Sequence, residues 1–183
     1  MIAKRMMALN LVAKARKKFK VTTDSCHKKP VAPNILEQDF TATKANQKWL
    51  SDITYISTQE GWLYLCVFID LFSRSIVGWS MSKSLKAELV TNALTMALYK
   101  RKFPKGVIIH SDRGSQYCSD KYQNMLKANK LICSMSSKGC CYDNAAMESF
   151  FHTLKVELVH DEKYKSREEA KTSVIVQTHV RFF

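Results

Sequence analysis

Three runs of β-forming residues follow one another between residues 49 and 81, with only short polar connections between them. They cover residues 49–56, 62–71 and 75–81, and each is rich in branched and aromatic side chains. Connections this short favour antiparallel pairing of consecutive strands. The sequence therefore predicts a three-stranded antiparallel meander.

Helical and strand patterns alternate after this meander. Apolar residues recur near the helical period over residues 85–102, 119–129 and 143–158, and short apolar runs lie between them at 107–109 and 132–135. The predicted order is βββαβαβα. This order is typical of an α/β fold, a mixed five-stranded sheet flanked by helices.

Basic residues outnumber acidic ones, with 29 Lys and Arg against 16 Asp and Glu and a net charge of +13. Nine of the basic residues and a single acid fall within residues 1–30. Nucleic acid is the leading partner class for such a charge. For the run that contains Lys17 and Lys18, a solvated tail and an arm that contacts phosphates are equally good interpretations.

The cysteines and the apolar runs argue against an exported or membrane-bound chain. Six cysteines include no Cys-x-x-Cys pair, and no secretory signal begins the chain, so we expect reduced, cytosolic thiols. The longest apolar run, residues 62–72, contains Asp70 and is far shorter than the roughly 20 residues that span a bilayer. No membrane partner is expected.

Three acids stand unusually close to apolar sequence. Asp52 lies inside the first strand, Asp112 follows the fourth strand, and Glu148 lies early on the last helix. Taken singly, they also fit an edge-strand charge, a turn acid and a solvated helix acid. Taken together, they provide the oxygen ligands that Mg²⁺ needs for phosphodiester chemistry.

The motifs around these acids occur in a fixed order along the chain. They are Trp49-Leu-Ser-Asp-Ile-Thr-Tyr-Ile56, Gly61-Trp-Leu-Tyr-Leu65, Asp70-Leu-Phe-Ser-Arg74, Val77-Gly-Trp79, His110-Ser-Asp-Arg-Gly-Ser-Gln-Tyr117, Ser134-Met-Ser136, Asp143-Asn-Ala145 and Glu148-Ser-Phe-Phe-His-Thr-Leu-Lys-Val-Glu157. Over residues 20–172 the chain resembles insertion-sequence transposases of the insertion-sequence-three type. These belong to the retroviral integrase superfamily, which has a ribonuclease-H-like fold. The 35 residues between Asp112 and Glu148 match the spacing of that family's acidic triad.

The resemblance implies a transposase or integrase core that cleaves DNA and transfers strands. Asp52, Asp112 and Glu148 would be its catalytic and metal-binding triad, with two Mg²⁺ or Mn²⁺ ions per site. The implied partners are element-end and target DNA, further copies of the chain, and an upstream helix-turn-helix protein or fused frame. The implied location is the bacterial cytoplasm, in association with the nucleoid. A ribonuclease-H-like nuclease and an inactive DNA-binding fragment of a decayed element are the two alternatives.

Other residues are expected to support the site. Asp70 and Asp143 are interpreted as supporting acids, with Asp143 as the N-cap of the last helix. Gln116 and Asn144 either orient site groups by hydrogen bonds or serve a local turn or cap.

Further residues are candidates for contacts with DNA. His152 and Lys155 follow Glu148 on one helix face, which either grips phosphate or is a solvated stripe. Arg113 and Lys138 are further phosphate candidates, with ordinary surface charge as the alternative.

The expected division of the chain has three parts. Residues 1–33 form a basic helical remnant and linker, 34–172 an integrase-like catalytic core, and 173–183 a truncated or frameshifted tail. Cys140 stands where many relatives have Asn, in the loop before Glu148. The His and Cys array of a retroviral zinc domain is absent.

Overall fold

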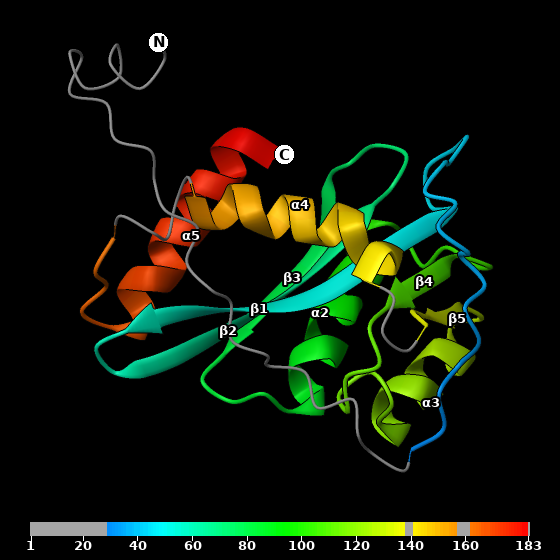
Figure 1. The fold of residues 1–183 in the computed structure, drawn as a ribbon, viewed down its shortest axis with the longest axis horizontal. Helices are drawn as coiled ribbons and strands as arrows, with labels where there is room; N and C mark the ends of the chain where they lie inside the picture. Colours follow the sequence, from blue (N-terminus) through cyan, green and yellow to red (C-terminus); the bar gives the residue numbers. More distant parts are fainter. Residues whose placement is uncertain (1–28, 138–140, 157–161, 183) are drawn as a thin grey trace, which may run out of the picture.

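The order of strands and helices follows the prediction, with one further helix at the end (Figure 1). The computed structural model describes residues 29–137, 141–156 and 162–182. In chain order the elements are β1 (Lys48–Thr58), β2 (Gly61–Asp70), β3 (Ile76–Ser82), α2 (Ala87–Lys100), β4 (Ile108–Ser111), α3 (Asp120–Ala128), β5 (Ile132–Met135), the 3₁₀ helix η1 (Cys141–Asn144), α4 (Ala145–Leu154) and α5 (Arg167–Phe182).

The five strands form one mixed sheet in the order β3-β2-β1-β4-β5. The meander β1-β2-β3 is antiparallel, as predicted, whereas β1 pairs with β4 and β4 with β5 in parallel. The pairing of β1 with β4 covers only residues 48–50 of β1. The rest of β1 therefore continues beyond the end of β4, at the edge where Asp52 and Asp112 lie.

Alternating side chains along the strands build two cores, one on each face of the sheet. Trp49 points into a core shared with α2 and α3, and its neighbour Leu50 into a core shared with α4 and α5. Figure 1 shows α4 crossing β1 on the second side. Because both faces are covered, the sheet carries a near-continuous apolar sequence in β2.

Close packing of β3 on α2 depends on a glycine. A Cβ atom at Gly78 would lie 2.3 Å from the carbonyl oxygen of Ala93 and 2.6 Å from the nitrogen of Ala97. Both are backbone atoms, so the helix could not yield by rotating a side chain. The glycine at the centre of the motif Val77-Gly-Trp79 is therefore required for the packing of β3 against α2.

The last two helices differ in detail from the prediction. The expected helix over 143–158 is a 3₁₀ turn followed by α4, which ends at Leu154. α5 runs without a break across the expected boundary between residues 172 and 173, and Val174 is buried in the second core. The interpretation of residues 173–183 as a truncated or frameshifted tail stays a prediction.

Two further observations bear on the expected partners. In the part of the chain that the structure describes, no helix is both long and apolar enough to cross a membrane. The basic run with Lys17 and Lys18, and the loop residues Lys138 and Cys140, lie outside the described residues.

Candidate active site

Two of the predicted acids meet where β1 and β4 run side by side. Leu50 of β1 is paired with His110 of β4, and Asp52 and Asp112 each lie two residues further along. Residues two apart on a strand point to the same face, and adjacent strands are about 4.8 Å apart. Asp52 therefore belongs to the sheet face that α4 covers, and Asp112, just past the end of β4, is near enough for its charge to act on Asp52.

Backbone and amide N–H groups hold these two carboxylates. Asp52 accepts hydrogen bonds from the backbone nitrogen of Ile53 at 2.7 Å and from Asn144 Nδ2 at 2.9 Å. Asp112 accepts one from the backbone nitrogen of Gly114 at 2.9 Å. Asn144, at the N-cap position of α4, thus links the start of that helix to β1, and a role in orienting a site group stays a prediction.

The pKa of the Asp52 carboxyl is raised from 3.8 to about 8. Burial is the largest cause, and the negative charge of Asp112 is the next. The hydrogen bonds from Ile53 and Asn144 oppose the shift, and the charge of Glu148 adds to it. A carboxylate that resists ionisation beside another carboxylate is a frequent feature of functional sites.

Glu148 approaches this pair from α4. It lies in the first turn of the helix, and its side chain is exposed. Its charge reaches Asp52, but no three His, Cys, Asp or Glu side chains within the described ranges are close enough together to hold one metal ion. The structure brings Asp52 and Asp112 together and leaves Glu148 further out.

The chemistry of the donors fits a hard divalent cation. Mg²⁺ prefers oxygen ligands and commonly takes only one or two protein carboxylates, with water and phosphate as the other ligands. A cation between Asp52 and Asp112 would also offset the repulsion that raises the pKa of Asp52. These two side chains are therefore the residues that could hold the ion.

A buried hydroxyl pair supports the site from the other face of the sheet. Ser51 Oγ and Tyr117 OH are 2.8 Å apart, and both residues are buried. The contact joins β1, next to Asp52, to the segment that follows Asp112. Sequence reasoning missed this pair, although a serine pointing into an apolar core is a signal that a partner must exist.

Asp70 is held by hydrogen bonds away from Asp52 and Asp112, so its expected support of the site stays a prediction. Its buried carboxylate accepts backbone N–H groups of Asn46 and Phe72 at 2.9 Å each, and it lies 3.6 Å from an Arg101 nitrogen. The N-cap prediction for Asp143 is wrong, because Asn144 occupies the N-cap position of α4 and Asp143 accepts its hydrogen bonds from other segments.

The residues predicted to contact DNA do not form one exposed helix face. His152 is exposed, but Lys155 is buried and its Nζ lies 4.4 Å from the centre of the Tyr55 ring. Burial lowers the pKa of Lys155, and the charge of Asp52 opposes that shift. Arg113 Nε donates to the carbonyl oxygen of Ser136 at 2.6 Å. Contact of these residues with DNA stays a prediction.

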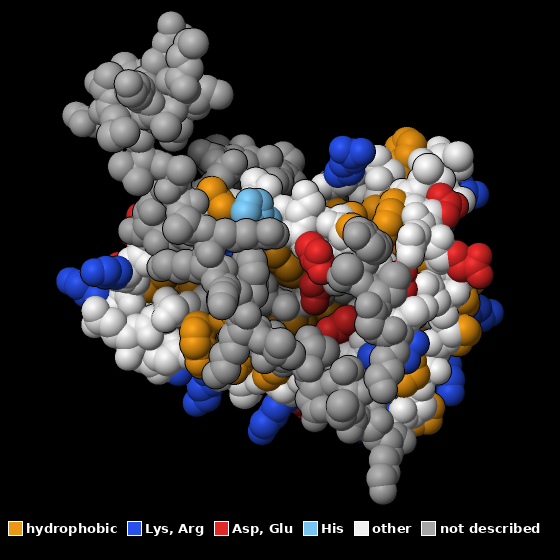
Figure 2. Space-filling model, viewed as in Figure 1, with side chains coloured by type: hydrophobic (Ala, Val, Ile, Leu, Met, Phe, Trp, Pro, Cys, Tyr) orange, Lys and Arg blue, Asp and Glu red, His pale blue; other side chains and the backbone are white. Residues whose placement is uncertain are grey.

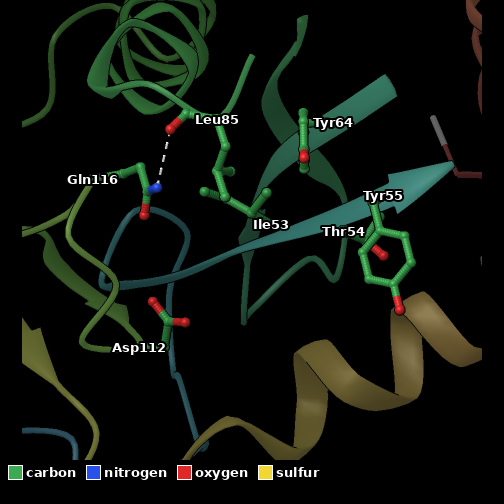
Figure 3. A pocket seen from close by; sticks show the side chains of 7 residues that line it. All are labelled: Ile53, Thr54, Tyr55, Tyr64, Leu85, Asp112 and Gln116. Carbon is green, nitrogen blue, oxygen red and sulfur yellow. Dashed lines mark hydrogen bonds between the residues drawn. The ribbon is translucent and has the colours of Figure 1, made fainter. Parts of the chain in front are cut away.

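A depression lies beside Asp112 along the free edge of β1 (Figure 3). Gln116 closes one end by donating from Nε2 to the carbonyl oxygen of Leu85 at 3.1 Å. Tyr55 lies at the other end and points toward α4. Figure 2 shows acidic side chains near the middle of the face seen in Figure 1, with Lys and Arg side chains around its edges.

Known relatives match most of the chain. Residues 42–141 match the integrase core domain family, and residues 148–175 match a second integrase core domain family. The transposase InsF for insertion sequence IS3A from Escherichia coli is 54% identical over 173 residues, which cover 94% of this chain and 60% of that protein. An insertion element IS600 uncharacterized 31 kDa protein from Shigella sonnei is 44% identical over 182 residues, which cover 66% of it. The chain thus spans about 60% of the length of the InsF relatives.

Solved structures share the fold at low sequence identity. The simian T-cell lymphotropic virus intasome in complex with PP2A regulatory subunit B56 gamma contains a chain with a TM-score of 0.64 at 17% identity, covering 87% of this chain and 56% of that one. The HTLV-2 integrase catalytic core domain in complex with magnesium gives a TM-score of 0.55 at 16% identity, covering 77% and 92%. The fold is therefore the ribonuclease-H-like fold of retroviral integrase cores, and the chain belongs to the integrase core domain family.

Proposed function

We propose that this chain is the catalytic core of a DNA transposase, which cleaves phosphodiester bonds and then joins the freed 3′ hydroxyl to another DNA strand. Asp52, Asp112 and Glu148 are its catalytic residues, and the ions are Mg²⁺ or Mn²⁺. The observation that carries the proposal is the pair Asp52 and Asp112. Adjacent parallel strands bring these two carboxylates close together, and a cation would relieve the repulsion between them.

Hydrogen bonds within the chain hold the two carboxylates in fixed orientations before a metal binds. Two ions, when bound, would stabilise the attacking and the leaving oxygens of an in-line displacement. Asn144 and the Ile53 amide fix the orientation of Asp52, and the Gly114 amide fixes that of Asp112. A carboxylate held in this way needs little rearrangement to become a ligand.

The proposed substrate is DNA, both element ends and target. A net charge of +13 favours binding of polyanions without regard to sequence. Recognition of element ends needs contacts with base edges, which we assign to an upstream helix-turn-helix part in the same or another polypeptide. Pairing of two ends implies more than one copy of the chain, and the reaction takes place on DNA in the bacterial cytoplasm.

The test is a reaction of the full chain with a labelled element-end duplex and a target duplex, in Mg²⁺, in Mn²⁺ and in EDTA. We expect nicks in either metal and none in EDTA, and joined products when the target is present. Asp52→Asn and Asp112→Asn should abolish both activities.

Asp70→Asn is the matched control, because Asp70 is a buried acid of the same motif set that contacts neither Asp52 nor Asp112. Nicks without joined products would identify a nuclease instead of a transferase. Nicking that persists in Asp52→Asn would show that these carboxylates do not carry the chemistry.

A further inference from the structure

Asp143 is a buried carboxylate that the proposed chemistry does not use. It is 1% exposed, and its carboxylate accepts hydrogen bonds from other segments of the chain. Asn34 Nδ2 and the backbone nitrogen of Ser137 donate to Oδ2 at 3.0 and 2.6 Å, and Gln38 Nε2 donates to Oδ1 at 3.0 Å. Removing such an acceptor leaves buried donors without a partner, which costs more than the bonds themselves contribute.

The neighbour of Asp143 contacts the site directly. Asp143 and Asn144 are the last two residues of η1, and Asn144 Nδ2 donates to Asp52 Oδ2 at 2.9 Å. Glu148 follows about one helical turn later on α4. The position of this short 3₁₀ helix therefore sets the position of one group that holds Asp52 and of the third acid.

The segment that holds Asp143 is itself fastened to the sheet. We call residues 33–38 the strap. The backbone nitrogens of Ile35 and Leu36 donate to Ser134 Oγ at 2.9 and 3.1 Å, and the same oxygen lies 2.9 Å from His110 Nδ1. The backbone nitrogen of Met135 donates to the carbonyl oxygen of Pro33 at 3.2 Å. The strap thus rests on β5 and on β4, two residues before Asp112.

We propose that Asp143 is a positioning residue for the carboxylate site. Its carboxylate ties η1 to the strap and to the end of β5, so that α4 begins where Asn144 reaches Asp52 and places Glu148 one helical turn further along. Asp143 itself contacts neither metal nor DNA. The inference rests on the proposed function, because it concerns how those three acids are held for metal binding.

The first test is Mg²⁺ binding by the full chain, measured by isothermal titration calorimetry well below the melting temperature. Asp143→Asn keeps the shape of the side chain but presents an amide N–H₂ to the N–H donors. We expect its half-saturating Mg²⁺ concentration to rise by about tenfold or more, the usual effect of losing a partner that orients metal ligands.

Asp70→Asn is again the matched control. Asp70 is a second fully buried aspartate that accepts N–H groups from two segments, but none of its partners contacts the site. We expect Asp70→Asn to lower the melting temperature and to leave the half-saturating Mg²⁺ concentration unchanged. An equal rise in both variants would reduce Asp143 to a general contribution to stability and overturn the proposal.

A charge exchange tests the strap contact itself. In the double variant Asn34→Asp with Asp143→Asn, one carboxylate and one amide still face each other, with the direction of the hydrogen bond reversed. We expect Mg²⁺ binding to recover at least threefold relative to Asp143→Asn alone. If Asp143→Asn does not fold, Asn34→Ala removes a single donor and should show the same change in Mg²⁺ binding at smaller size.

Hydrogen exchange of the metal-free chain separates this proposal from the proposed function. Without Asp143, amides of residues 144–148 and of Ile53, which donates to Asp52, should exchange at least tenfold faster than in the parent chain and in Asp70→Asn. Unchanged exchange, or unchanged Mg²⁺ binding in a variant that folds, would overturn the positioning role. A parent chain that binds no metal would refute the proposed function, while the exchange result would still decide the role of Asp143.

Discussion

The raised pKa of Asp52 predicts how the stability of the metal-free chain depends on pH. Its carboxyl keeps its proton in the folded chain up to about pH 8, whereas in the unfolded chain it ionises near 3.8. A pKa that is raised by folding contributes stability at low pH, and that contribution is lost as the pH rises toward the folded value. The metal-free chain should therefore lose stability between pH 5 and pH 8.

The size of this loss has an upper limit. Each pH unit between the two pKa values costs about 1.4 kcal/mol, so the interval from pH 5 to pH 8 costs at most about 4 kcal/mol. Asp52 is partly exposed, so water screens part of the repulsion and of the burial effect. We therefore expect about 2–3 kcal/mol.

The assay compares the parent chain with Asp52→Asn by urea denaturation in EDTA at several pH values. Titrating groups that do not interact with Asp52 cancel in the difference between the two, and the repulsion from Asp112 is part of the effect that is measured. The variant should keep its contact with Asn144. The buried Oδ1 of Asn144 has no hydrogen-bond partner among the described residues and can accept from the new amide after a flip of the Asn144 side chain.

We expect the parent chain to become less stable than Asp52→Asn as the pH rises, and saturating Mg²⁺ to remove most of that trend. A stability difference that changes by less than about 0.5 kcal/mol between pH 5 and pH 8 would refute the argument from burial and repulsion.

Three further predictions follow from other parts of the molecule. Mg²⁺ or Mn²⁺ should raise the melting temperature in calorimetry, and Asp112→Asn should abolish the rise; a full response in that variant would remove Asp112 from the site. Gly78→Ala should lower the free energy of unfolding by about 3 kcal/mol in urea denaturation, because its Cβ would overlap backbone atoms of α2; a cost below about 1 kcal/mol would contradict the packing reason. Neutralising Lys14, Lys17 and Lys18 should reduce the slope of log binding constant against log salt by up to about 3 in a DNA-binding titration, whereas an unchanged slope would favour the solvated tail.

The sequence alone was enough to predict the order of the elements from β1 to α4 and to single out two acids that the fold brings close together. The strand and helix periods are local properties of the chain, and they were strong in every element from β1 to α4. Asp52 and Asp112 stood out because they lie inside or just after a buried strand. Burying an unpaired charge there costs free energy. Their spacing and surrounding motifs pointed to one family, which the match over residues 42–141 confirms.

Only the tertiary structure decided which distant groups meet. The role of Asp143 could not be read from its neighbours, because its partners Asn34 and Gln38 lie more than 100 residues away and come close only when the strap crosses β5. Lys155 has the spacing of an exposed helix face, yet the crossing of α4 over β1 turns it onto the ring of Tyr55. Periodicity tells which residues share a face of one element, but the packing of the elements determines what that face touches, and packing depends on the whole chain at once.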